Sequence, residues 1–570
     1  MRKILLTLTT ALLIGSQSIK AQTARVMAIH NSPDAALSSV DVWLVTPLGS
    51  TKLIDNFNFR NASGYIDAPA GINIRVAFAP ANSNTINDTL LGYGFNLTAN
   101  QNYVLMATGT IGTGYTPAKP FDLKVITPVF ERITGGTQTQ LTLVHASTDA
   151  PNVALQVRKM NVEVTSISSF EYGNVVATPI FTDDYFLDIL AGDNLVTTLS
   201  VPLKSLNLTD SALVVFASGF LNPANNNNGP AFGIFAALSN GTVVQLPVKN
   251  TFRLQVVHNC ADPAAANVDI WLKNVATNTN TKLLSNFGFR QATPFIDAPA
   301  LVDLEIGVAP AGSTSPNDII FSVETGTIPG GLTAIAYASG VLDTSGFAEN
   351  PNDIDILFDI LGLGSTEKAL TNGKVTVNVI HGVTDAPAVN VRVKDGPVLF
   401  EEYEYGDASD GESVDVDPAN YILEIVPSGS ANALVSYRAD LTSFRDSALA
   451  IFASGFLNPS ANKNGPAFGL MAVTPGGRVL MLKPITTSVR NIVAANNSLS
   501  VYPNPATNFI NIKSDKDLET LSIYDMQGRV VYNDKYTENL NLSNLNISKG
   551  IYQLVAECQN HTFTTKLMVE

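Results

Sequence analysis

Four segments of the chain alternate apolar and polar residues in the same order, and each segment ends on a histidine. The residues four and two positions before the histidine are apolar, and the residue between them is polar in three of the four segments. A period of two is typical of a β-strand with one buried face, so the histidine is predicted to point inward. The residue directly before it is also aliphatic, which indicates that both faces are covered near the strand end. The histidines are His30, His145, His258 and His381, preceded by Ile29, Val144, Val257 and Ile380.

A second strand follows each histidine, and its alternation is clearer. Odd positions are always aliphatic, whereas even positions vary among Asp, Asn, Trp, Gln, Arg and Ala in the segments 40–44, 153–157, 268–272 and 389–393. Trp43 and Trp271, the two tryptophans of the chain, occupy even positions. They are therefore predicted to point away from the core and to be exposed.

The histidine belongs to a longer phrase that recurs at intervals of about 110 to 125 residues. An aspartate follows four residues later, and an Ala-Ser/Thr-Gly triplet begins 72 to 80 residues after the histidine. Solenoid and propeller repeats have periods of about 20 to 50 residues, so each unit is predicted to be a whole domain. FASGFLNP occurs only in the second and fourth units and IDAPA only in the first and third, which indicates the order A-B-A′-B′. The aspartates are Asp34, Asp149, Asp262 and Asp385.

Short strands punctuated by turns fill every unit, and the sequence contains no amphipathic helix of twelve residues. Seven or eight strands in about 100 residues predict an all-β protein, made of tandem immunoglobulin-like β-sandwich domains and a small C-terminal β-sandwich. The predicted boundaries are 24–130 for repeat A, 131–249 for B, 250–372 for A′, 373–487 for B′, 488–498 for a linker and 499–570 for the C-terminal domain.

The first 21 residues have the features of a secretory signal peptide. Arg2 and Lys3 precede an apolar run from Ile4 to Ile14, and a polar stretch ends at Ala21, where cleavage is expected. The apolar run is too short to anchor the protein in a bilayer, and no later segment is apolar enough to form a membrane helix. The mature protein is therefore predicted to be soluble and to be exported through the periplasm.

Composition excludes several classes of partner. The net charge is −15, which argues against nucleic acid and anionic lipid, because both require clustered Lys and Arg. Cys260 and Cys558 are the only cysteines and fall in different predicted domains, so no disulfide framework is expected. Units of about 115 residues can bury enough surface to fold without one.

Three motifs mark the end of the chain: Tyr502-Pro503-Asn504-Pro505, the turn at 524–529 that contains Gly528, and the segment from Gly550 to Tyr552. Together they resemble the type A C-terminal sorting domain of the type IX secretion system over residues 499–570. The resemblance implies a bacterium of the Bacteroidetes type and recognition by the type IX machinery. It also implies export across the outer membrane, with removal of the domain and either release or attachment to surface lipopolysaccharide.

HNSPDA with VDVW, followed by IDAPAG and Ala-Thr/Ser-Gly, resembles the bacterial family called domain of unknown function 4397. The resemblance covers most of residues 24–485 and extends to all four repeats. The family has no agreed activity, so the resemblance adds an expected fold and little chemistry.

The repeated His-Asp pair is predicted to be structural. A catalytic pair needs a nucleophile, and we find no G-x-S-x-G elbow, no H-E-x-x-H helix and no cysteine with a partner. One His and one Asp per unit are too few ligands for zinc. A neutral imidazole at a strand end can instead bond the following loop while the aspartate caps its turn. No catalytic or metal residue is therefore predicted, and the protein is predicted not to be an enzyme.

Calcium is the one metal that the sequence leaves open. Oxygen ligands are plentiful in two Asn-rich loops and in one acidic stretch, although Asn-Gly clusters are also ordinary turn formers. No cofactor is otherwise expected. The segments are 222–229 and 458–465, and the acidic residues are Asp407, Asp410, Glu412, Asp415 and Asp417.

The best candidates for ligand binding are the two tryptophans, because an exposed indole can stack on a sugar ring. The alternative is that a neighbouring strand or the adjoining B repeat covers them. The leading hypothesis is a non-enzymatic secreted or cell-surface protein whose repeats act as a spacer or in adhesion. The second hypothesis is an extracellular glycan-binding protein that uses Trp43 and Trp271 to bind a surface glycan or another host or cell-surface ligand.

Overall fold

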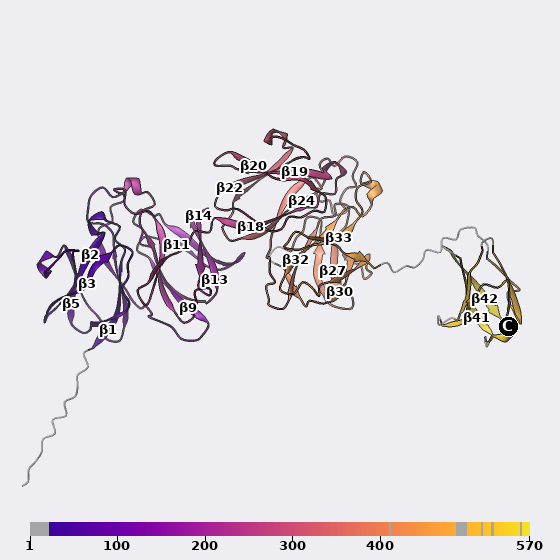
Figure 1. Cartoon of the computed structure of the whole chain (residues 1–570), viewed down its shortest axis with the longest axis horizontal. Coiled ribbons are helices and arrows are strands. Elements are labelled where there is room, and N and C mark those ends of the chain that lie inside the picture. The colour runs from indigo at the N-terminus through magenta and orange to yellow at the C-terminus, as the bar shows by residue number, and fades with distance from the viewer. Residues whose placement is uncertain are drawn as a thin grey trace, which may run out of the picture. The chain divides into compact units, whose positions relative to one another are not determined.

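The computed structural model describes residues 22–409, 412–485, 499–514, 517–525, 529–545, 547–558 and 561–570. The chain divides into two compact units, Met1–Pro484 and Ile485–Glu570 (Figure 1). Strands form nearly all the regular structure, and the predicted all-β class with sandwich domains is confirmed. The predicted signal peptide 1–21, the linker 488–498, Asp410 and Gly528 lie outside the described residues.

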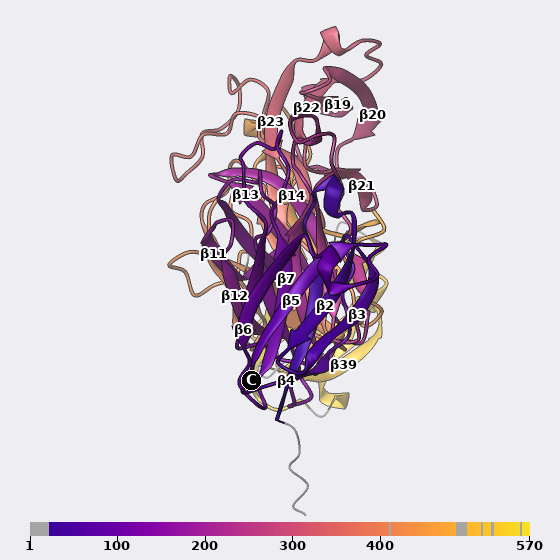
Figure 2. The same cartoon turned by 90° about the vertical axis from the view of Figure 1, so that its left-hand side faces the viewer.

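Repeat A is a sandwich of two four-stranded sheets, ordered β4-β1-β7-β8 and β3-β2-β5-β6. β1 lies inside its sheet, antiparallel to β4 and parallel to β7. An immunoglobulin constant domain instead groups its strands as A-B-E-D and C-F-G, so the strand order here is a different one. Figure 2 shows β2, β3 and β5 side by side. The strands are β1 Thr23–His30, β2 Ser39–Thr46, β3 Gly49–Asn58, β4 Ile66–Pro69, β5 Asn73–Pro80, β6 Leu91–Asn96, β7 Asn102–Thr108 and β8 Asp122–Ile126, with 3-10 turns η1 Ala35–Leu37 and η2 Ile86–Asp88.

Repeat B keeps this strand order and adds one strand, giving β12-β9-β15-β16-β17 and β11-β10-β13-β14. β9 corresponds to β1 and again runs parallel to the seventh strand of its repeat, β15. The strands are β9 Gln138–Val144, β10 Val153–Lys159, β11 Val162–Phe170, β12 Val175–Phe181, β13 Asp184–Ala191, β14 Asn194–Pro202, β15 Ala212–Ser218, β16 Gly233–Leu238 and β17 Val243–Gln245, with the 3-10 turn η3 Pro223–Asn225.

Repeat A′ reproduces repeat A as β21-β18-β24-β25 and β20-β19-β22-β23. The same two-sheet arrangement therefore follows from the same alternation of residues. The strands are β18 Thr251–His258, β19 Asn267–Asn274, β20 Thr279–Gly288, β21 Ile296–Pro299, β22 Asp303–Pro310, β23 Phe321–Thr327, β24 Thr333–Ser339 and β25 Asp359–Gly364, with 3-10 turns η4 Pro263–Ala265 and η5 Pro316–Asp318.

Repeat B′ reproduces repeat B as β29-β26-β32-β33-β34 and β28-β27-β30-β31-β35. Its last strand, β35, extends the second sheet. The strands are β26 Val375–His381, β27 Val389–Val393, β28 Val398–Tyr403, β29 Val414–Val416, β30 Asn420–Pro427, β31 Val435–Asp440, β32 Ala448–Ser454, β33 Gly469–Val473, β34 Val479–Met481 and β35 Lys483–Pro484, with the 3-10 turn η6 Pro459–Ala461.

The C-terminal unit is a smaller sandwich of two sheets, β36-β37-β40 and β39-β38-β41-β42. Ile510, Leu521, Ile523 and Leu554 are fully buried between them, so this unit has a core of its own. The strands are β36 Ser500–Tyr502, β37 Phe509–Lys513, β38 Thr520–Tyr524, β39 Val530–Lys535, β40 Asn539–Asn541, β41 Gly550–Cys558 and β42 His561–Val569, with the 3-10 turn η7 Leu542–Asn544.

The outer face of the first sheet of repeat A packs against repeat B. Ile29 and Met106 from A form one apolar cluster with Val144 and Phe216 from B. Repeats A′ and B′ share an equivalent cluster, which contains Val257, Ile380 and Phe452. The sequence indicated that both faces are covered near the strand end, and the partner repeat covers the aliphatic residue before each histidine.

The expectation that the first strand has only one buried face is wrong. Thr142, Gln255 and Asn378, which precede their histidines by three residues, are as buried as the core. Gln255 explains how polar groups are accommodated there, because its amide donates to the carbonyls of Thr293, in its own repeat, and Thr474, in B′. The second face of the strand is covered because the repeats dock on one another. Period-two alternation within one strand does not indicate such a contact.

Candidate functional site

The four motif histidines lie at equivalent buried positions, each at most 3% exposed. Each ring contacts a backbone carbonyl of the loop that follows its strand. His30 Nε2 lies 2.6 Å from the carbonyl oxygen of Leu37, and His258 Nε2 lies 2.8 Å from that of Ala265. His145 uses Pro151 at 3.1 Å, and His381 bonds the backbone of Pro387. The imidazole therefore ties the strand end to the next loop.

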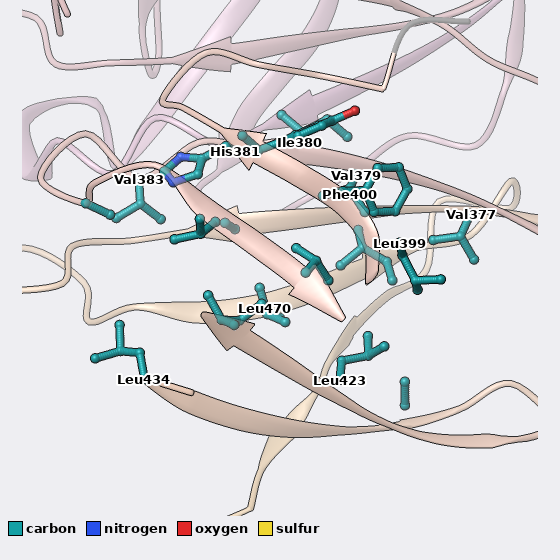
Figure 3. A pocket seen from close by; sticks show the side chains of 18 of the residues that line it. Val377, Val379, Ile380, His381, Val383, Leu399, Phe400, Leu423, Leu434 and Leu470 are labelled. Atoms are coloured by element: carbon teal, nitrogen blue, oxygen red, sulfur yellow. The ribbon is translucent and has the colours of Figure 1, made fainter. Parts of the chain in front are cut away.

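These rings are neutral because a protonated ring would lack a partner for its second N–H. A carbonyl can only accept, so Nε2 carries the hydrogen, and the buried Nδ1 atoms of His145, His258 and His381 have no hydrogen-bond partner. Burial lowers the pKa of all four histidines, to about 4 for His30 and His258. In Figure 3, His381 stands at the end of the apolar space between the sheets of repeat B′.

The motif aspartates accept hydrogen bonds from backbone amides of a distant loop. Asp34 accepts from the amide of Ala36 in its own turn and from those of Ile111 and Gly112, each at 2.8 to 2.9 Å. Asp262 bonds its own turn through Ala264 and the distant loop through Leu342. In the A repeats the aspartate thus caps its turn and also clamps the loop that follows Ala-Ser/Thr-Gly.

In the B repeats the same aspartate organises the Asn-rich loop. Asp149 accepts from the amides of Leu221 and Asn222 at 2.9 Å and from the side chain of Asn226 at 3.1 Å. Asp385 makes the three equivalent bonds with Leu457, Asn458 and Asn462, each at 2.7 to 2.8 Å. The carboxylate oxygens are thus already engaged by N–H donors, and they serve to hold the loop.

The described carboxylates of the acidic stretch in repeat B′ do not converge on one point. Asp407 accepts from the amide of Glu404, Asp415 from the hydroxyl of Thr376, and Asp417 pairs with Lys374. Across the described part of the chain, no group of three or more His, Cys, Asp or Glu side chains is placed to hold a metal ion. Calcium therefore stays a sequence prediction, without a located site.

Trp43 and Trp271 do lie on the predicted face, opposite the aliphatic core, but the expectation that they are exposed is wrong. Their exposed fractions are 9% and 8%. Trp43 packs on Ala77 and Ala79 beneath Ile86, in a small cluster separate from the main core. The loop around η2 folds over the indole, so neither ring face is open for stacking on a sugar. The alternation of residues predicted the face of the strand on which each tryptophan lies. It could not predict that a segment about forty residues later in the chain covers this face.

Sequence reasoning missed the polar cluster beside each tryptophan. Trp43 Nε1 donates to Ser83 Oγ at 3.0 Å, Ser83 donates to Asp41 at 2.6 Å, and Lys52 donates to Asp41 at 2.7 Å. Repeat A′ contains the same arrangement, with Trp271, Ser313, Asp269 and Lys282. The signal for it was the recurrence of Asp, Trp and Lys at matching positions in A and A′.

Asp41 is ionised at the base of this cluster. Burial by itself would raise its pKa, but hydrogen bonds from Lys52, Ser83 and the amide of Asn56 outweigh burial and hold the pKa at about 2. The pKa of Asp269 is also about 2, for the same reasons. The charged pair and the serine thus fasten the covering loop to the sheet.

Repeat A is joined to repeat B by an arginine. Arg60 donates to Ser218 Oγ at 3.0 Å, and its guanidinium lies 4.3 Å from the ring centre of Phe235. Arg290 makes the equivalent bond to Ser454 at 3.1 Å in the second pair. Tyr115 stacks on Phe220 across the same interface, with ring centres 5.5 Å apart. Each A-B pair is therefore fastened by polar and aromatic contacts as well as by its shared apolar cluster.

We expect Arg60→Ala to weaken the docking of A on B by about 2 to 3 kcal/mol, because it removes charge-assisted hydrogen bonds at a partly buried interface. Hydrogen exchange of β7 and β15 in the mature chain measures the effect. Arg75→Ala, on the exposed side of β5, is the matched control and should leave exchange unchanged. Equal protection in Arg60→Ala and the wild type would show that the apolar cluster alone holds the pair.

The sorting-motif residues form part of the C-terminal fold. The Asn504 side chain donates to the carbonyl of Lys566 at 2.6 Å and accepts from the amide of Met568 at 2.8 Å. Tyr552 is buried and donates to the carbonyl of Ser548. Gly550 begins β41, whereas Tyr502 is 44% exposed, beside Pro503 and Pro505. The motif thus ties the start of this domain to its last strand and leaves one aromatic ring accessible.

Two family models match the chain. The one described as secretion system C-terminal sorting domain matches residues 500–570, and the one described as domain of unknown function (DUF4397) matches residues 24–156. The second match covers repeat A and the first part of repeat B. The sorting domain supports export by the type IX secretion system, contact with its machinery, and secretion or attachment at the outer-membrane surface. Among the described residues, no helix is long and apolar enough to cross a bilayer.

No curated protein matches the chain. Among solved structures, the TIE protein of Bacillus anthracis is 8% identical, with 73% of this chain and 67% of that chain covered and a TM-score of 0.14. The product complex of the glycogen-degrading pneumococcal virulence factor SpuA is 10% identical, with 76% and 38% covered and a TM-score of 0.12. At these scores neither likeness supports an inference about fold or function.

Proposed function

We propose that the protein is a non-enzymatic, type IX-exported surface or secreted protein, in which two docked A-B pairs act as a spacer or in adhesion. The observation that carries the proposal is the docking itself. Each B repeat covers the outer face of the first sheet of its A repeat. Both pairs use the same apolar and arginine contacts. Because this face of each repeat is covered by its partner, it is not open to an external ligand. The arrangement therefore favours a mechanical role over binding at this face.

The junction between repeat B and repeat A′ also supports a spacer. Arg158 donates to the carbonyl of Gly330 at 2.9 Å, and Asn161 exchanges hydrogen bonds with the backbone of Thr333. A side chain at Gly331 would collide with the ring of Phe186, so the glycine permits this close approach. Contacts of this kind restrict the motion of one A-B pair against the next.

We also propose that all four repeats are versions of the domain that the DUF4397 model matches over 24–156. The shared His-Asp phrase and the common strand order, 4-1-7-8 facing 3-2-5-6, support this proposal. A and B would have diverged before the A-B pair was duplicated, since A resembles A′ and B resembles B′ in their distinguishing phrases.

The spacer role is tested on cells that display the protein with an epitope tag after residue 21. Deleting residues 250–487 removes one A-B pair and should bring the tag closer to the membrane, which energy transfer to a membrane dye measures. Secretion should be unchanged, because 499–570 is intact. An unchanged distance would contradict the spacer role, and lost attachment of cells to a surface at unchanged distance would point to adhesion.

Export provides a separate prediction. We expect cleavage after Ala21, and we expect a chain lacking 499–570 to accumulate in the periplasm instead of reaching the surface or the medium. Cell fractionation with an antibody against the repeats measures this. Normal display or release of the truncated chain would contradict the assignment of the sorting domain.

A second proposal is that the protein binds a surface glycan or another host or cell-surface ligand. The two tryptophans are not proposed as its binding residues, because their rings are covered. A glycan array run on the mature chain tests it. Selective binding that survives Trp43→Phe and Trp271→Phe would place the ligand elsewhere on the repeats.

A further inference from the structure

Repeat B contains a cavity between its two sheets. Its volume is about 200 Å³, and its walls include Leu141, Leu155 and Tyr185. The other cavities between sheets, in A, A′, B′ and beside His145 in repeat B itself, measure about 50, 30, 60 and 50 Å³. Protein interiors normally pack without voids larger than a water molecule, so this space requires an explanation.

The cavity is bordered by the edge strands of both sheets. β11 is the outer strand of one sheet and β12 the outer strand of the other. Thr165 pairs with Val157 and Thr178 pairs with Leu141, so both threonines face inward with their core partners. In the other three repeats the position of Thr178 is Ile66, Ile296 or Val414. Repeat B thus has a hydroxyl where the other repeats have an aliphatic side chain.

The cavity reaches the surface at the seam between these strands, because exposed Thr165 and Ser166 belong to its lining. Thr178 on β12 is half-buried and also belongs to the lining. The cavity is therefore apolar, with hydroxyl groups at its mouth.

We propose that repeat B binds a small molecule whose ring-sized apolar group enters this cavity and whose single hydroxyl or carbonyl group lies at the mouth. An apolar cavity of about 150 Å³ is enough to bind benzene, so 200 Å³ accommodates a substituted ring. The walls offer apolar contact, and the Thr165 hydroxyl offers a hydrogen bond. The Thr178 hydroxyl donates to the carbonyl of Pro179 at 3.3 Å and can still accept a hydrogen bond from the ligand. This site goes beyond the spacer or adhesive role and does not depend on it.

The probes are p-cresol and toluene, titrated into the mature chain by calorimetry. p-Cresol should bind at one site per chain, and toluene should bind about fivefold more weakly, because it lacks the group that hydrogen-bonds at the mouth. Thr178→Ile should weaken p-cresol at least about tenfold by filling the mouth. Thr178→Ser keeps the hydroxyl and the space and should change the affinity by no more than about twofold.

Thr178→Ile is expected to fold, since isoleucine occupies this position in repeats A and A′, and a melting curve checks that it does. Crystals under xenon pressure provide a second measurement, with a xenon site expected in the wild-type cavity and absent in Thr178→Ile. Absence of p-cresol binding to the wild type, or equal binding by Thr178→Ile, would overturn the proposal. Xenon binding without p-cresol binding would also overturn it, because the mouth would then not admit a substituted ring.

Discussion

Trp43→Ala is expected to destabilise repeat A by about 3 to 5 kcal/mol, the usual cost of emptying a buried aromatic site. The indole fills the space between Ala77, Ala79 and Ile86 and donates to Ser83. Its loss removes both the packing and the hydrogen bond that hold the covering loop. Trp271→Ala should have the same effect on repeat A′, because its indole donates to Ser313 in the same way.

Hydrogen exchange resolved by peptide suits this measurement, since a chain of several domains does not unfold in one step. Residues 39–96 should lose protection in Trp43→Ala, while residues 267–327 stay protected and act as the internal control. Trp43→Phe keeps a ring in the cluster and should lose less stability than the alanine variant. A loss below about 1 kcal/mol for Trp43→Ala would mean that the loop does not depend on the indole, and a binding role would again be open.

Acidification from pH 7 to pH 4 is expected to destabilise the four repeats, because their histidines are buried as neutral rings. Burial lowers the pKa of His30 and of His258 from 6.5 to about 4. Between these values the unfolded chain binds more protons than the folded chain, so stability falls as the pH falls through 6.5 and levels off near 4. The difference corresponds to about 3 kcal/mol for each of these two histidines.

The upper part of this pH range separates the histidines from the buried carboxylates. Asp41 and Asp269, with pKa values of about 2 in the folded chain, begin to lose their contribution to stability only below about pH 5, where the unfolded carboxylates start to be protonated. Peptide-resolved unfolding at pH 7, 6, 5 and 4 provides the measurement. His30→Gln keeps a donor near Leu37 and cannot be protonated, so repeat A should lose much of its pH dependence. His561→Gln, outside the repeats, is the control. An unchanged pH profile in His30→Gln would show that other groups cause the acid sensitivity.

The alternation of residues was sufficient to predict how each strand faces. Val42 and Leu44 lie on the core side and Trp43 on the other side, as the period of two requires. The inward orientation of His30 followed from the same period, and its bond to the next loop followed from the chemistry of a buried imidazole. These properties depend on residues close together in the chain, and the four internal copies made them visible.

Strand order and the covering of outer faces could not be predicted in the same way. β1 lies beside β7, more than seventy residues later, and alternation says nothing about which strands pair. The partner of the Trp43 indole is Ser83, and the partner of Arg60 is Ser218. Neither contact has a local signature, because a residue pattern reports whether a face is apolar and does not report what covers it.

The sequence by itself thus determined the all-β class, the phase of the strands, the inward histidines and the sorting domain, all of which rest on local periodicity or on short motifs. Only the tertiary structure decided that the tryptophans are buried, that each A repeat docks on its B partner and that repeat B has an open seam. The reason is physical. Burial and cavity volume depend on how distant segments fill space together, and a difference as small as Thr178 in place of Ile66 acquires meaning only beside the strands that surround it.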